Sequence, residues 1–215
     1  MSRPAKTTRR YSSTRRREQA RQTQAAVLAA ARRLFLEKGY GDTTVAAIAG
    51  AADVSVETIY KAFGNKEGLL KAVVDVAIVG DDEPVPMLQR ELVRTIEAEP
   101  DGIEKLRIYG GHLARSAPRR APLELLARAA AATDPGAGRV WARLQDELLA
   151  GMTAFARHLR DAGCLRDGIS LNEARDVLWM YVSADVFDLL VRQRGWSSRR
   201  YGRWVSEALA AALLR

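Results

Sequence analysis

The chain has 215 residues, which is room for one large domain or two small ones, and its 47% hydrophobic and 28% charged residues are typical of a soluble globular protein. A single cysteine, Cys164, excludes an internal disulfide and fits a reducing compartment, so we expect a cytoplasmic protein. No apolar run reaches the roughly 18 residues that a membrane-spanning helix needs.

The positive charge is concentrated at the start of the chain. Of the 34 basic and 26 acidic residues, residues 1–66 hold 13 and 5, which accounts for the whole formal net charge of +8. A basic excess confined to one segment indicates a polyanionic partner, because neutralising DNA phosphates releases counterions. The alternative is a basic tail that only aids solubility.

The first predicted elements are an arm and a helix. Residues 1–13 are rich in Ser, Thr, Arg and Pro and are expected to be a disordered basic arm. Residues 14–38 have helical periodicity, and Gly39 is expected to end this helix. Its predicted buried stripe consists of Val27, Leu28, Ala31, Leu34 and Phe35.

Two short helices are predicted next. Apolar Val45, Ile48, Ala49 and Ala52 fall on one helical face, with Thr43 or Thr44 as the N-cap. A second short helix follows the break at residues 53–55, where Ser55 is a suitable cap, and its Ile59 and Phe63 are expected to point inward. A third helix is predicted over residues 66–79.

Small residues within the first of these short helices allow close crossing, as a helix-turn-helix requires. The pattern therefore predicts a helix-turn-helix, although a small helical bundle without a nucleic-acid partner has similar spacing.

The remainder of the chain is predicted to be helical. An acidic stretch with two prolines, residues 80–86, is interpreted as a linker. The predicted helices cover residues 87–99, 102–116, 122–133, 138–162, 171–194 and 197–214. Apolar residues of the last two helices spread too widely for one buried stripe, which favours a symmetric dimer; packing within one chain is the alternative. They are Val177, Leu178, Tyr181, Ala184, Phe187, Val191, Trp204, Val205, Leu209 and Leu213.

From Gln24 to Val74 the sequence resembles the DNA-binding domain of the TetR-type (tetracycline-repressor) family. The residues that carry the resemblance are Ala30-Ala31, Leu34-Phe35, Gly39-Tyr40, Thr43-Thr44-Val45, Ile48-Ala49, Ala52, Val54-Ser55, Thr58-Ile59-Tyr60, Phe63 and Lys66-Glu67-Gly68-Leu69-Leu70. The resemblance implies an all-α homodimer in which N-terminal helices bind DNA and C-terminal helices form a ligand pocket and the dimer interface. The implied domains are an arm over residues 1–13, a helix-turn-helix domain over 14–66, a connecting helix over 67–80 and a ligand-binding and dimerisation domain over 81–215.

The resemblance also implies DNA-binding roles. Thr44 and Tyr60 would bond phosphates, and Lys66 would sit at a helix start and pair with the backbone. The residues that would face or flank the base edges are Ser55, Val56, Glu57, Thr58 and Lys61.

Three residues, at two places in the second short helix, depart from the commoner family pattern. Glu57 replaces a small residue or proline; it would either accept from cytosine N4 or turn aside to cap the helix. Lys61 and Ala62 stand where aromatic residues or histidine are frequent, and Lys61 could reach guanine or a phosphate. These departures leave the operator sequence open.

The C-terminal part offers candidates for a ligand pocket, although core packing is the alternative for each. Gly110 and Gly111 are unusual inside a helix and would make room for a ligand or for a crossing helix. The candidate lining residues are Tyr109, His112, Trp141, Met152, Phe155, Trp179 and Met180.

The sequence favours a ligand-responsive transcriptional regulator: a repressor that binds a palindromic operator as a dimer until a small-molecule effector releases it. The alternatives are a helical small-molecule-binding module without specific DNA binding, and a non-specific DNA-coating protein. No metal-ligand spacing, nucleophile elbow or glycine-rich phosphate loop is present, so we expect no enzyme, no metal and no cofactor.

Overall fold

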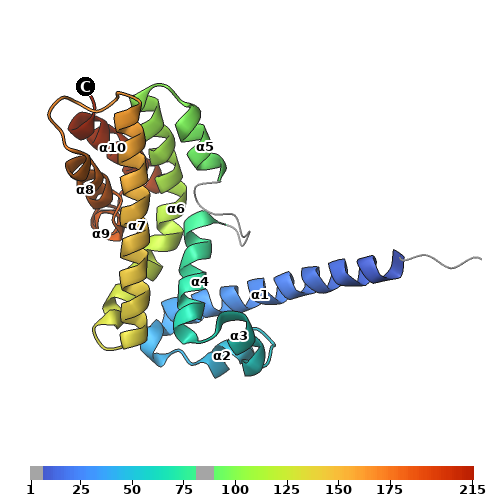
Figure 1. The fold of residues 1–215 in the computed structure, drawn as a ribbon. Helices are drawn as coiled ribbons and strands as arrows, with labels where there is room; N and C mark the ends of the chain where they lie inside the picture. The colour runs from blue at the N-terminus through green and yellow to red at the C-terminus, as the bar shows by residue number, and fades with distance from the viewer. Residues whose placement is uncertain (1–6, 81–89) are drawn as a thin grey trace, which may run out of the picture. The chain divides into compact units, whose positions relative to one another are not determined.

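The computed structural model describes the backbone of residues 7–80 and 90–215, and the side chains of residues 18–80 and 90–215. Within these ranges the chain is helical (Figure 1). The only β-type pairing in them is an isolated bridge between Leu165 and Leu214. The predicted all-α class is therefore confirmed. Two compact units are formed, Met1–Val73 and Val74–Arg215. No helix in the described ranges has the length and apolarity to cross a bilayer.

The first unit is built from α1 (Thr7–Asp42), α2 (Val45–Ala51), α3 (Val56–Phe63) and the start of α4 (Lys66–Val79). Helix α1 begins earlier than predicted, so residues 7–13 of the expected disordered arm are helical, while residues 1–6 lie outside the described residues. Gly39 interrupts the helical path with a φ of 82°, a left-handed conformation that glycine adopts readily.

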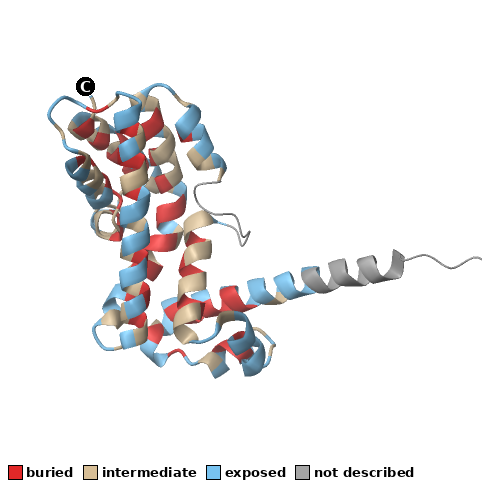
Figure 2. Ribbon diagram, in the orientation of Figure 1, coloured by how far each residue is buried: buried red, intermediate tan, exposed pale blue. Residues whose placement is uncertain are grey.

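The predicted apolar stripe of α1 forms one wall of the first unit's core, with all five residues buried. Opposite them lie buried residues of α2, α3 and α4, drawn in red in Figure 2. They are Ile48, Ala49, Ile59, Leu69 and Leu70, each at most 3% exposed. Phe63, expected to point inward with Ile59, is only half-buried. The short helices α2 and α3 are thus held by the longer helices that flank them.

The second unit contains the rest of α4 and the helices that follow the predicted linker, whose residues 81–86 lie outside the described residues. Helix α6 packs against α7 and α10, and α8 packs against α7. The elements are α5 (Glu91–Ala98), α6 (Gly102–Ala131), α7 (Pro135–Asp161), α8 (Leu171–Tyr181), α9 (Ala184–Phe187), the π-helical turn η2 (Asp188–Gln193) and α10 (Ser198–Leu213).

The prediction of separate helices over residues 102–116 and 122–133 is wrong, because α6 runs continuously through Pro118 and Pro122. An interior proline costs about 3 kcal/mol of helix stability. Here the cost is offset by burial on both sides of the prolines, where Leu113, Ala117 and Leu123 are at most 2% exposed. Helix α7 begins at Pro135, earlier than the predicted residue 138, because Asp134 accepts a hydrogen bond from the Ala137 amide.

The single predicted helix over residues 171–194 is also wrong, because the chain breaks between Tyr181 and Ala184. The carbonyl of Val182 accepts a 2.6 Å hydrogen bond from the guanidinium of Arg120, on α6. Ser183 is extended, and its hydroxyl accepts from the Val186 amide, which starts α9. A tertiary hydrogen bond and a new N-cap replace the helical continuation.

The apolar residues used to infer a second apolar face are mostly buried in this unit's own core. Leu178, Phe187 and Leu209 are at most 3% exposed, and Trp204 packs against the same core. Packing within one chain therefore explains these positions. The large apolar side chains left exposed in this region are Trp179, Met180 and Leu189.

Candidate nucleic-acid interface and buried polar cluster

A tight turn joins α2 to α3. The Ala52 amide donates to Ile48 O at 2.9 Å, and the Val54 amide donates to Ala49 O at 3.0 Å. Between them Asp53 has a φ of 53°, a left-handed conformation that Asp tolerates better than most residues. These bonds turn the chain within three residues, so α3 is set at a defined angle to α2.

The two adjacent threonines before α2 have different roles. Thr44 is the N-cap, and its Oγ1 accepts from the Ala47 amide at 3.1 Å. Thr43 is fully buried, and its hydroxyl donates to Gly39 O at 2.7 Å and lies 3.1 Å from Leu34 O. Thr43 thus ties α2 to the end of α1, a role that the sequence did not distinguish from capping.

Ser55 caps α3, as predicted. Its Oγ accepts from the Thr58 amide at 3.1 Å and shares a 2.9 Å hydrogen bond with Thr58 Oγ1. Glu57 is exposed in the first turn of α3, and Ser55 occupies the capping position that Glu57 would otherwise take. The Glu57 carboxylate is therefore presented to solvent.

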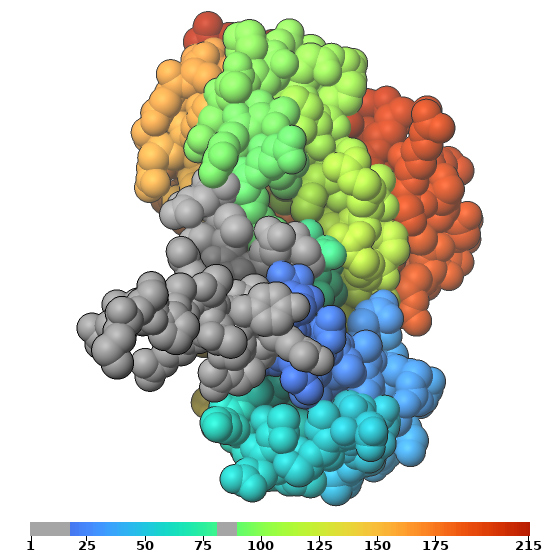
Figure 3. Space-filling view, turned by 90° about the vertical axis from the view of Figure 1, so that its right-hand side faces the viewer, coloured from blue at the N-terminus to red at the C-terminus, as the bar shows by residue number. Residues whose placement is uncertain are grey.

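The outer face of α3 carries the side chains expected to face bases. Val56 and Tyr60 are 37% and 49% exposed, Thr58 and Lys61 are exposed, and Ile59 alone is buried. Figure 3 shows this part of the chain, in cyan, at the molecular surface. One face of α3 thus anchors it, while the opposite face offers methyl, hydroxyl, carboxylate and ammonium groups.

Lys66 has a mainly structural position. It is the first residue of α4, its Nζ donates to Gly41 O at 3.3 Å, and it lies 4.2 Å from the centroid of the Tyr40 ring. Tyr40 in turn packs against Phe35 of α1. This cation–π and backbone contact fixes the start of α4 against the end of α1.

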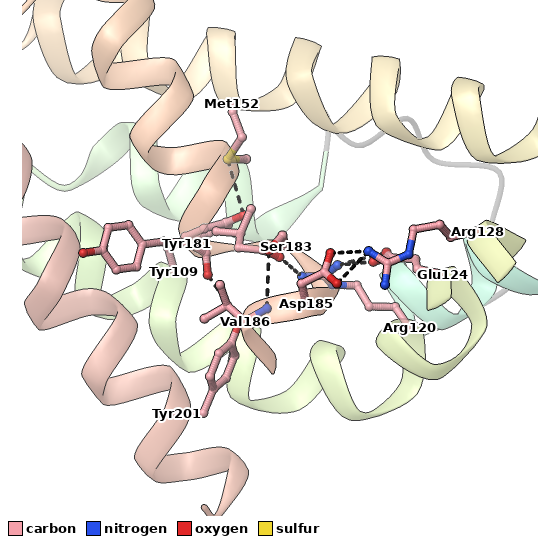
Figure 4. Close-up of polar contacts among 11 residues, drawn as sticks. Tyr109, Arg120, Glu124, Arg128, Met152, Tyr181, Ser183, Asp185, Val186 and Tyr201 are labelled. Carbon is pink, nitrogen blue, oxygen red and sulfur yellow. Dashed lines mark hydrogen bonds and ion pairs between the residues drawn. The ribbon is translucent and has the colours of Figure 1, made fainter. Parts of the chain in front are cut away.

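In the second unit, four of the seven predicted pocket residues lie together. The Tyr109 hydroxyl is 3.8 Å from the Met152 sulfur (Figure 4). The Tyr109 ring meets Phe155 edge-on at 5.2 Å and stacks on His112 at 6.2 Å. Met152 and Phe155 are buried in the core. Helices α6 and α7 therefore bring these side chains into one cluster.

The other three predicted pocket residues lie elsewhere. Trp141 contacts the guanidinium of Arg128 at 6.0 Å, and Trp179 and Met180 are 36% and 44% exposed on α8. Because Ala174 and Leu178 turn inward, the residues after Leu178 fall on the outer face of α8. The structure does not bring these three into the Tyr109 cluster.

A buried ion pair that sequence reasoning missed lies beside this cluster. Arg120 Nη1 donates to both carboxylate oxygens of Glu124, at 2.7 and 2.9 Å, and the two side chains are 6% and 9% exposed. Burial acts to lower the pKa of Arg120, but the contact with Glu124 outweighs it, so the pKa is raised and the guanidinium stays charged. The spacing i, i+4 also suits ordinary surface pairs, so nothing in the sequence marked this one.

Burial shifts the titration of the neighbouring groups. It raises the pKa of Tyr109 and that of Tyr201 to about 12. It lowers the pKa of His112 to about 4, with further lowering by Arg120, Arg115 and Arg119. At neutral pH both phenols and the imidazole are uncharged.

Comparison with known proteins identifies the first unit. Residues 27–73 match the family model described as bacterial regulatory proteins, tetR family. A curated relative, the HTH-type transcriptional regulator YvkB of Bacillus subtilis (strain 168), is 44% identical over 54 residues. That stretch spans 25% of this chain and 29% of the relative, less than a third of its length.

Solved structures share the fold over nearly the whole chain. The regulator FadR of Bacillus subtilis, in complex with stearoyl-CoA, has a TM-score of 0.68 and 18% identity, covering 87% of this chain and 97% of that one. A transcriptional regulator from Saccharomonospora viridis, in complex with choline, has a TM-score of 0.64 and 17% identity, covering 89% and 97%. NalD of Pseudomonas aeruginosa, the secondary repressor of the MexAB-OprM multidrug efflux pump, has a TM-score of 0.65 and 18% identity, covering 90% and 96%.

The family match lies on the helix-turn-helix, and the helical second unit has the fold of these regulators. Over the matched residues 27–73, the helix-turn-helix of this chain is that of the tetR family of bacterial regulatory proteins.

Proposed function

We propose that this protein is a ligand-responsive transcriptional repressor at the bacterial nucleoid. It binds a palindromic operator as a homodimer, is released by a small-molecule effector, and acts by binding rather than by catalysis. The observation that carries the proposal is the exposed polar face of α3, on an anchored helix within the segment that holds the whole basic excess. Such a face can enter the major groove while surrounding cations neutralise phosphates.

Each exposed side chain of α3 has a role in base readout. Val56 and the Thr58 methyl meet thymine methyl groups, and Lys61 donates to guanine or to a phosphate. Glu57, uncommitted to the helix cap, accepts from cytosine N4. Ser55 holds the Thr58 hydroxyl in place, since their oxygens are 2.9 Å apart.

The flanking residues position the helix on the DNA backbone. Thr44 at the start of α2 and the half-exposed Tyr60 bond phosphates, and Lys66 keeps α4 in place behind them. Contacts of this kind set orientation and affinity without reading sequence.

The dimer uses the apolar surface that remains outside the core. Trp179 and Met180 on α8 and Leu189 on η2 are 36%, 44% and 53% exposed, and large exposed apolar side chains favour association. A two-fold dimer presents two copies of α3 to two half-sites, which is why the operator is palindromic.

Effector release follows from differential affinity. Two of the similar solved proteins hold stearoyl-CoA and choline, which supports a small-molecule site in the helical second unit here. An effector that binds the DNA-free conformation more tightly must weaken operator binding by the same factor.

The test is fluorescence anisotropy with DNA from upstream of the protein's own gene and with a scrambled duplex of equal length. We expect a preference of about a hundredfold or more for the upstream DNA. Thr58→Ala should weaken that binding about tenfold or more, since a base contact contributes ~1–3 kcal/mol. Thr95→Ala is the matched control, because Thr95 is an exposed helical threonine of the second unit whose hydroxyl donates to Glu91 O within its own helix.

The outcomes separate the candidate functions. Equal and salt-sensitive binding to both duplexes would indicate non-specific coating of DNA. Binding to neither duplex, with a ligand still bound, would indicate a helical small-molecule module in which Glu57 repels phosphates. Parent-like affinity in Thr58→Ala would show that α3 does not read the bases as proposed.

A further inference from the structure

Ser116 is a polar residue in the interior that lacks a partner. It is 1% exposed, and its Oγ is the one buried side-chain nitrogen or oxygen atom in the described residues without a hydrogen-bond partner. A buried hydroxyl without a partner destabilises the folded state. An unpaired polar atom at such a position is explained if a bound molecule supplies the missing acceptor.

Ser116 belongs to a polar stripe of α6. His112, Ser116 and Arg120 are spaced four residues apart, so their side chains lie above one another on one helical face. Arg120 makes three hydrogen bonds within the described chain, which leaves part of its five N–H donors for another acceptor. Among the residues that the structure describes, the Tyr109 hydroxyl bonds only the Met152 sulfur, a weak acceptor. Ser116, Arg120 and the nearby Tyr109 thus offer N–H and O–H donors that a strong acceptor could use.

The charge around the stripe is positive. Arg115, Arg119 and Arg120 all act on His112, and Glu124 is paired with Arg120. His112 itself is neutral, with a pKa of about 4. An anion entering this region is stabilised both by the excess positive charge and by the free donors.

Apolar groups lie next to these donors. Phe155 and Met152 contact Tyr109 from α7, and both are buried. The pairing of a cationic, donor-rich stripe with an aromatic and thioether wall matches a ligand with an anionic head and an apolar body.

We propose that the effector of this protein is an apolar carboxylate whose carboxylate group binds the Ser116 hydroxyl and the Arg120 guanidinium, with its apolar body against Tyr109, Met152 and Phe155. This inference rests on the proposed function, since it names the chemical class of the effector. It also gives a route to release. Arg120 holds the Val182 carbonyl at the break between α8 and α9, so a carboxylate that draws the guanidinium away loosens this break.

The experiment measures two properties of the full chain separately. Ligand binding is followed by the rise in Tm with octanoate and with 3-phenylpropionate, each compared with its uncharged amide. Operator binding is followed by anisotropy with and without each compound. The variants are Ser116→Ala and a control, Ser206→Ala, which removes a buried hydroxyl that already bonds Arg203 O.

We expect at least one carboxylate to bind about tenfold or more tightly than its amide and to release the operator. Ser116→Ala should fold, since it removes an unpaired hydroxyl, and should weaken carboxylate binding about tenfold, while Ser206→Ala binds like the parent. The inference is overturned if neither carboxylate raises the Tm, if amide and carboxylate bind alike, or if Ser116→Ala binds unchanged. Operator binding without any compound tests the proposed function by itself. If no carboxylate binds but the operator does, only the effector inference fails; if the operator does not bind, the proposed function fails.

Discussion

At the scale of single residues, identical neighbours take opposite roles. Thr43 and Thr44 are adjacent and alike, yet one is buried and bonds the end of α1 while the other is exposed and caps α2. Caps such as Ser55 could be predicted because a cap depends on residues within one helical turn. The role of Thr43 depends on the carbonyls of Gly39 and Leu34, four and nine residues away. They come into reach because of the kink at Gly39, which the sequence pattern indicates only as a helix end.

The buried charges were the residues that could not be predicted. Arg120 and Glu124 have the same spacing as the exposed pair Arg143 and Glu147, and burial alone separates them. Burial depends on α9 and α10 packing against α6, which the local sequence pattern does not encode. Tertiary packing also decided which predicted pocket residues meet. It brings together Tyr109, His112, Met152 and Phe155, whereas Trp179 and Met180 are exposed on α8.

His112 makes stability depend on pH. Its pKa is about 4 in the folded state against 6.5 in the unfolded chain, so the unfolded chain binds the proton first as the pH falls. The free energy of unfolding therefore decreases between pH 6.5 and 4, by up to about 3 kcal/mol from this residue. In His112→Gln that contribution disappears.

The measurement is urea unfolding of the parent and of His112→Gln near pH 7 and near pH 4.5. Comparing the two pH values within each protein cancels effects of the substitution that do not depend on pH, and carboxylate titration is common to both. Equal losses of stability in the two proteins would show that His112 keeps an ordinary pKa in the fold.

At the scale of elements, the glycine pair in α6 separates into two functions. Gly110 lies where α6 crosses α10: an added Cβ would be 2.4 Å from the backbone oxygen of Gly202. At Gly111 the nearest atom to an added Cβ is the flexible end of Arg115, at 3.6 Å. The glycine pair was expected to make room either for a ligand or for a crossing helix. Gly110 makes room for the crossing helix α10.

The two glycines therefore respond differently to the same substitution. Gly110→Ala should destabilise the protein by about 1–3 kcal/mol, since backbone atoms must move apart. Gly111→Ala should stabilise it by about 0.5–1 kcal/mol, because alanine is the better helix former and meets only ordinary contact. Thermal unfolding of both variants provides the check, and a Gly110→Ala variant as stable as the parent would contradict the close crossing.

Interrupted and continuous helices were the elements most often mispredicted. Prolines were expected to end α6, and uninterrupted helical periodicity was expected to continue α8; both expectations failed because long-range contacts outweighed local preference. In the first unit, where short helices and their caps are fixed by neighbours in sequence, the predicted order of elements holds.

At the scale of the whole molecule, charge is segregated by position in the chain. Residues 1–66 account for the net charge of +8, and the remainder is neutral overall. The proposed DNA contacts should therefore be strongly salt-dependent, while ligand binding inside the second unit should depend on salt far less.

Raising monovalent salt from about 50 to about 200 mM should weaken operator binding on the order of a thousandfold, if roughly six phosphates are neutralised. The preference for operator over scrambled DNA should change much less, since base contacts release no counterions. A titration of anisotropy at several salt concentrations gives the slope. A flat dependence would mean that the basic segment does not contact the phosphates.

The break between α8 and α9 also determines how the molecule presents its surface. The segment from α8 to η2 consists of two helical parts separated by this break. The exposed Trp179 and Met180 precede the break, and the exposed Leu189 follows it. The hydrogen bond from Arg120 of α6 to the Val182 carbonyl holds the chain at this break from the interior. If two copies associate through these apolar side chains, the interior of each copy therefore determines how the two are oriented relative to each other. A substitution of Arg120 would then change the orientation of the two copies without changing any residue at their interface.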